Sequence, residues 1–239
     1  MWGLANPDRF MRLTRGWGAG FGILATILIL AGLWLGFSAP EDYQQGDTVR
    51  IMFIHVPAAW VSLAAYLALG AASFSVLVWR HPLADVAAKA CAPIGAVFTV
   101  LALVTGSLWG KPMWGTWWVW DARLTSVFVL LLFYLGIIAL RASIDDEARA
   151  GRAAAVLGLV GLVNLPIIKF SVDWWSTLHQ PASVFRADGP TMTADYLWPL
   201  GLMGLGYTLL FAALWIVAIR SEVRERRIAA LMLRQAKGS

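Results

Sequence analysis

Long apolar stretches alternate with short polar segments along the whole chain. The six longest apolar stretches fall at residues 18–37, 53–79, 87–109, 124–141, 153–170 and 197–219. A helix needs about 20 predominantly apolar residues to cross the hydrocarbon of a bilayer. An isolated apolar strand cannot span lipid, because its backbone donors and acceptors would stay unpaired. The pattern therefore predicts an all-α integral membrane protein, built as a bundle of six transmembrane helices.

The composition favours a membrane protein over a soluble one with an enlarged core. The chain has 239 residues, of which 59% are hydrophobic and 14% charged, whereas soluble domains have about 25% charged residues. This length fits one domain over residues 1–239. The net charge of +5 is compatible with nucleic-acid binding, but basic loops beside a lipid bilayer account for it, and we expect no nucleic-acid partner.

The basic residues predict how the chain is oriented. Of the 19 Lys and Arg residues, 14 lie in the N-terminal tail, the second and fourth loops and the C-terminal tail, and five lie in the other loops. Because cytoplasmic segments carry the excess of Lys and Arg, we expect both termini in the cytoplasm and loops one, three and five outside. The first stretch is too long for a signal peptide and lacks a good cleavage site, so we expect it to remain as a span.

The third loop, at about 109–125, has the most unusual local pattern. Four of the fourteen tryptophans lie there within seven residues, at Trp114, Trp117, Trp118 and Trp120. An interfacial aromatic belt explains single tryptophans but not such a cluster. Because the first three are spaced i, i+3 and i+4, a helical turn would place them on one face, and Pro112 is expected to stop the preceding helix. The loop thus predicts an outward, apolar platform that suits a flat aromatic macrocycle.

Two charged residues follow these tryptophans. Asp121 stands where the fourth span begins, and its carboxylate is expected to cap that helix. Arg123 has a guanidinium group that pairs with carboxylates through two parallel hydrogen bonds, or that reaches the interface by extending along the helix. Haem is a flat aromatic macrocycle that carries two carboxylate groups, its propionates. Arg123 is therefore a candidate partner for a haem propionate.

The three histidines fall into two groups. His81 precedes Pro82 in a basic loop, and we expect it to be solvated. His55 lies at the outward end of the second span and His179 in the fifth loop, so the predicted topology puts both on the side of the tryptophans. A single histidine is more often structural, but two neutral imidazoles on one face suit the binding of haem iron from opposite sides. His55 and His179 are therefore the candidate metal ligands.

Other motifs narrow the possible functions. The lone Cys91 lies in an apolar stretch, and no CxxCH pattern is present, so covalent haem attachment through thioethers is not expected. The segment from Gly106 to Lys111 is one residue too short for a phosphate-binding loop, and Pro112 replaces its Ser or Thr. Asn164 is the most polar residue at depth, which argues against an ion-coupled pump.

Residues 114–125 resemble the signature Trp-Gly-x-x-Trp-x-Trp-Asp-x-Arg-Leu-Thr of the haem-handling C proteins of bacterial cytochrome c maturation, the CcmC family. The predicted spans and the two outward histidines match as well, so the resemblance covers nearly the whole chain. It implies a non-enzymatic subunit of the bacterial inner membrane that holds haem b without a covalent bond, between His55 and His179 and against the loop from Trp114 to Arg123.

The resemblance also implies partners. These are a periplasmic membrane-anchored haem chaperone (CcmE), an ATP-binding cassette pair (CcmA and CcmB) and a small membrane subunit (CcmD). Three other functions remain open from the residues themselves: an electron-transfer subunit with a b-type haem, a permease for another small molecule, and an assembly subunit whose tryptophans bind a protein.

Overall fold

The computed structural model describes residues 6–180 and 183–238, and the regular structure of this part is helical. Its elements are α1 (Pro7–Leu13), α2 (Trp17–Phe37), the 3₁₀ helix η2 (Asp47–Ile51), α3 (Met52–Trp79), α4 (Pro82–Trp114), α5 (Ala122–Ser143), α6 (Glu147–Gly161), α7 (Asn164–Trp174) and α8 (Ala194–Gly238). Within the described residues, six helical segments are long and apolar enough to cross a membrane. The predicted six-span, all-α bundle is confirmed.

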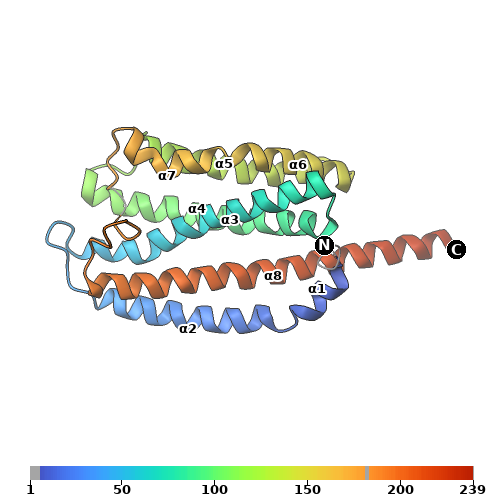
Figure 1. Ribbon diagram of the computed structural model, residues 1–239, viewed down its shortest axis with the longest axis horizontal. Helices are drawn as coiled ribbons and strands as arrows, with labels where there is room; N and C mark the ends of the chain where they lie inside the picture. Colours follow the sequence, from blue (N-terminus) through green and yellow to red (C-terminus); the bar gives the residue numbers. More distant parts are fainter. Residues whose placement is uncertain (1–5, 181–182, 239) are drawn as a thin grey trace.

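The helices lie side by side along the long axis of the molecule (Figure 1). The pair α3 and α4 occupies the middle, between the pair α2 and α8 and the group α5, α6 and α7. The loops before η2, between α4 and α5 and between α7 and α8 gather at one end of the bundle, and α1 and the end of α8 lie at the other. The outward loops predicted from the sequence thus share one end.

The predicted fifth span at 153–170 is confirmed, because Glu147–Trp174 is a helical segment long and apolar enough to cross a membrane, but its α-helix is interrupted. Helix α6 ends at Gly161 and α7 begins at Asn164. Pro166 has no N–H, so the carbonyl of Leu162 has no helical donor four residues later. The Asn164 side chain, buried here, donates to the carbonyl of Ser126 on α5 over 2.8 Å. This bond satisfies the most polar group at membrane depth.

Six charged side chains join four helices at the end away from the loops. They are Asp85 and Lys89 of α4, Arg141 of α5, Glu147 of α6, and Glu222 and Arg226 of α8. Asp85 lies 2.6 Å from Arg141 and 2.8 Å from Arg226, and Lys89 lies 2.7 Å from Glu222. The group carries three negative and three positive charges, so each half-buried ion has an opposite partner.

Close packing at the centre of the bundle depends on a glycine of α4. Gly95 is buried, and a Cβ built on it would collide with the ring of Tyr134 on α5. Tyr134 is fully buried and donates its hydroxyl to the carbonyl of Ser62 over 2.9 Å. Tyr134 of α5 therefore connects to α4 through its contact with Gly95 and to α3 through its hydrogen bond to Ser62.

We expect Gly95→Ala to lower the free energy of unfolding by about 2 kcal/mol, because overpacking a filled core forces the ring from its place. The measurement is equilibrium unfolding in detergent. Gly20→Ala is the matched control, since nothing lies within 4 Å of a Cβ at that helical glycine. Equal stability of the two variants would contradict the packing argument.

Candidate functional site

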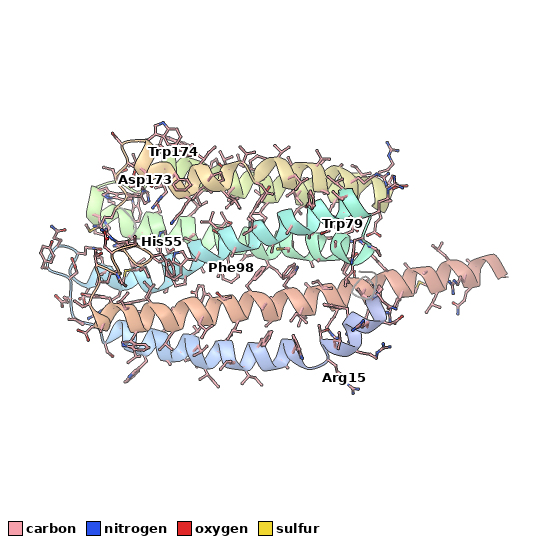
Figure 2. The ribbon with its side chains drawn as sticks, viewed as in Figure 1. Arg15, His55, Trp79, Phe98, Asp173 and Trp174 are labelled. Carbon is pink, nitrogen blue, oxygen red and sulfur yellow. The ribbon has the colours of Figure 1, made fainter. Side chains whose placement is uncertain are left out.

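His55 lies in the first turn of α3, at the end of the bundle where the loops gather, whereas Arg15 and Trp79 lie at the other end (Figure 2). Its Nδ1 is 3.0 Å from the carbonyl oxygen of Ala102 and 3.2 Å from the hydroxyl of Thr105 on α4. Because a carbonyl only accepts, this contact favours the tautomer with the proton on Nδ1. The lone pair of Nε2 is then available to a metal.

A glycine and a tryptophan of α4 fit the His55 ring into place. A Cβ on Gly106 would lie 2.9 Å from Cε1 of His55, so the ring occupies the space that a side chain would need. The Trp109 ring meets it edge to face at 5.7 Å and donates its Nε1 to Gln45 of the first loop over 2.8 Å. Neither the close approach at Gly106 nor the ring contact of Trp109 is predicted from the sequence, although two glycines four residues apart, Gly106 and Gly110, indicate close packing along this helix.

His179 lies in the loop between α7 and α8, next to the start of α5. Its Nδ1 is 2.9 Å from one carboxylate oxygen of Asp121. The other oxygen of Asp121 accepts the backbone N–H of Leu124 over 2.7 Å and caps α5. The predicted capping role of Asp121 is confirmed, and the same carboxylate also orients His179.

Two opposing effects act on the pKa of His179. Burial, the larger effect, lowers this pKa because it disfavours the charged imidazolium, and the hydrogen bond and charge of Asp121 raise it. The net result is a pKa below the ordinary value of 6.5. His179 is therefore neutral at pH 7, with Nδ1–H donating to Asp121 and Nε2 left as an acceptor.

The loop between α4 and α5 differs from its prediction. Helix α4 continues through Pro112 to Trp114 and ends at Gly115, whose φ of 76° is left-handed and suits glycine. Residues 116–121 are not helical. The expectations that Pro112 stops the helix, and that three tryptophans share one face of a helical turn, are therefore wrong.

The tryptophans consequently have separate surroundings. Trp114 folds back over Gly110 and meets the His179 ring at 4.9 Å, edge to face. Trp117 lies 5.7 Å from Nζ of Lys111. Trp118 and Trp120 pack on each other at 5.3 Å and on Phe128 of α5, and Trp120 is 72% exposed. Among Trp114, Trp117, Trp118 and Trp120, the ring contact with a histidine is that of Trp114, so these four tryptophans form no single platform.

Arg123 lies between α5 and α7, near both histidines. Its Nε donates to the hydroxyl of Ser171 on α7 over 3.1 Å. The positive charge of Arg123 acts against protonation of His179. Trp114, Asp121, Arg123 and His179, together with His55 at the same end of the bundle, make up what we call the histidine site.

The other candidate residues lie outside this site. His81 lies outside the helices and is partly exposed, and it also accepts the backbone N–H of Ala84 over 3.1 Å and caps α4, a role not predicted from the sequence. Cys91 is fully buried, as predicted, and contacts the carbonyl of Ala65. Among the described residues, no group of three His, Cys, Asp or Glu side chains has the arrangement of a metal site.

Comparisons with known proteins agree with this architecture. The family model described as "Heme exporter protein C" matches residues 1–234. Proteins of that name from Bradyrhizobium diazoefficiens and Escherichia coli K12 are 58% and 46% identical, over 98% of this chain and 89% and 97% of their own lengths. A putative cytochrome c biosynthesis ccmC-like mitochondrial protein of Marchantia polymorpha is 44% identical, over 84% of this chain and 83% of its own. The chain therefore belongs to the heme exporter protein C (CcmC) family.

Proposed function

We propose that the histidine site holds haem b at the outer face of the bacterial inner membrane, and that the chain delivers it to a periplasmic haem chaperone during cytochrome c maturation. The printed names of the relatives, heme exporters, support haem as the cargo. The clustering of the basic segments at the end opposite the site supports cytoplasmic termini.

The observation that carries this proposal is the state of the two imidazoles. Each has its Nδ1 against an oxygen acceptor, the carbonyl of Ala102 for His55 and the carboxylate of Asp121 for His179. Such partners fix the ring orientation of metal-ligating histidines and strengthen the ligand. Both Nε2 atoms would then be available to hold one haem iron, and an iron held by two histidines would suit transient storage.

The neighbouring residues supply what the rest of the haem needs. Arg123 is the propionate partner in this proposal, because it lies in the first turn of α5, two residues after Asp121, and a guanidinium pairs with a carboxylate through two hydrogen bonds. Trp114 offers an apolar ring against the haem edge. Trp117 and Trp120 are exposed around the site, and together with Trp118 they form the surface on which the chaperone (CcmE) docks.

The proposed assembly places this chain among transport subunits. It works with the ATP-binding cassette pair CcmA and CcmB and the small subunit CcmD, and energy comes from that pair because the sequence has no phosphate-binding loop. The chain binds and orients haem and catalyses no reaction itself.

We expect the purified protein with added haem to give a low-spin, six-coordinate absorption spectrum. His55→Ala and His179→Ala should each convert it to a high-spin form, because each removes one axial nitrogen. His81→Ala is the control, since His81 caps α4 far from the site. A wild-type protein without haem affinity, or single variants that keep the low-spin spectrum, would refute the ligand assignment.

Delivery is tested separately from binding. We expect Trp120→Ala to keep the low-spin spectrum and to slow haem transfer to the purified chaperone roughly tenfold, as expected when an exposed aromatic anchor of an interface is lost. Trp34→Ala, at a 75% exposed tryptophan of α2, should transfer haem at the wild-type rate. Equal transfer rates for the two variants would remove Trp120 from the docking surface.

Replacing the partner of His179 tests the role of Asp121. In Asp121→Asn the amide still caps α5, but the negative charge that raises the His179 pKa is gone. We therefore expect this pKa to fall further below 6.5 in NMR titrations of ¹³C-labelled histidine, and haem affinity at pH 7 to drop roughly 10- to 100-fold. Asp188→Asn, in the same outer region, should change neither quantity. An unchanged or higher pKa in Asp121→Asn would contradict the observed hydrogen bond.

A further inference from the structure

Helix α8 extends past the rest of the bundle at the end opposite the histidine site. Figure 1 shows its last turns projecting alone, in line with the part that packs on α2. Arg227 still contacts Asp8 of α1. From Ile228 to Ala236 every residue is exposed.

This projecting segment carries large apolar side chains. Ile228, Leu231, Met232 and Leu233 are 53–63% exposed. The first three are spaced i, i+3 and i+4, so they lie on one face of the helix. Leu233 lies beside this face, and exposed apolar surfaces of this kind mark contacts with another protein or with a membrane.

The position of the projecting segment along α8 excludes burial of its apolar side chains in the bilayer. Helix α2 has 21 residues and begins at Trp17, and the adjacent Gly18 packs on Val217 of α8, so the edge of the hydrocarbon lies near Val217. Ile228 lies eleven residues farther along the same helix, or about 16 Å at 1.5 Å per residue. The headgroup layer on one side of a membrane is only roughly 5–8 Å thick. The apolar face therefore lies beyond the lipid.

The charges of the segment select the kind of partner. Residues 228–238 contain Arg234 and Lys237 and no Asp or Glu, whereas the preceding Arg226 and Arg227 are already paired with carboxylates of the bundle. A second copy of this helix would bring like charges together, which opposes self-association. A groove with an apolar floor and acidic borders complements both features, as when an amphipathic helix binds in a groove.

We propose that residues 228–236 of α8 are a docking helix for a water-soluble protein domain, which binds them in an apolar groove bordered by Asp and Glu side chains. The contact lies on the side of the membrane opposite the histidine site. It does not depend on haem binding, so each proposal can fail without the other.

The single native cysteine makes this proposal testable by thiol labelling. Cys91 is fully buried, so Met232→Cys supplies the reactive thiol. We expect a polar maleimide to label it roughly tenfold more slowly in permeabilised membranes of the native host than in purified protein in detergent, because a site occupied about nine-tenths of the time has one-tenth of its thiols accessible. Ala142→Cys, exposed at the same end of the bundle, is the control and should react equally in both.

A second substitution tests the acidic groove. Adding Arg234→Glu to Met232→Cys should restore fast labelling in native membranes, because it places a negative charge against the acidic border. Equal labelling of Met232→Cys in native membranes and in detergent overturns the proposal, and so does protection that survives Arg234→Glu. Protection of the purified protein by phosphatidylglycerol vesicles, or by raising its own concentration, also overturns it, in favour of a lipid surface or a second copy.

Discussion

A bilayer offers the backbone no hydrogen-bonding partner, and this constraint governs where the protein can place its chemistry. Every residue at membrane depth must lie in a helix or pair its polar groups internally. The interruption between α6 and α7 is accompanied by the bond from Asn164 to Ser126. Groups that bind or ionise are therefore brought to the two ends of the bundle, the histidine site at one end and the six-charge group of α4, α5, α6 and α8 at the other.

The histidine site depends on a few short links between helix ends and loops. Asp121 joins the start of α5 to His179, and Ala102 and Gly106 hold His55 against α4. Each link uses a group that the fold already needs, a helix cap, a backbone carbonyl or a glycine. The imidazoles are consequently oriented before any ligand arrives, which lowers the ordering cost of binding.

The architecture follows from the sequence because span length and basic loops are governed by the bilayer, a solvent common to all such chains. The cap at Asp121 was predictable because it depends on one residue and its neighbours. The break at Gly161 was not, since it depends on Pro166 together with a partner on another helix. The arrangement of the tryptophans was not predictable either. Gly115 ends α4 in a left-handed conformation, so the chain leaves the helix between Trp114 and the later Trp117 and Trp120. The cap formed by Nδ1 of His81 was not predictable, because histidine is not among the residues that usually cap the N-terminus of a helix.

The interruption of the fifth span has a mechanical consequence for the site. Helix α7 has eleven residues, or about 16 Å, so it is a short helical unit that follows the interruption after α6. His179 follows this unit along the chain, and Ser171 on it holds Arg123. A tilt of α7 that moved His179 away from Asp121 would therefore also part Ser171 from Arg123, so that one movement would change two contacts of the histidine site together.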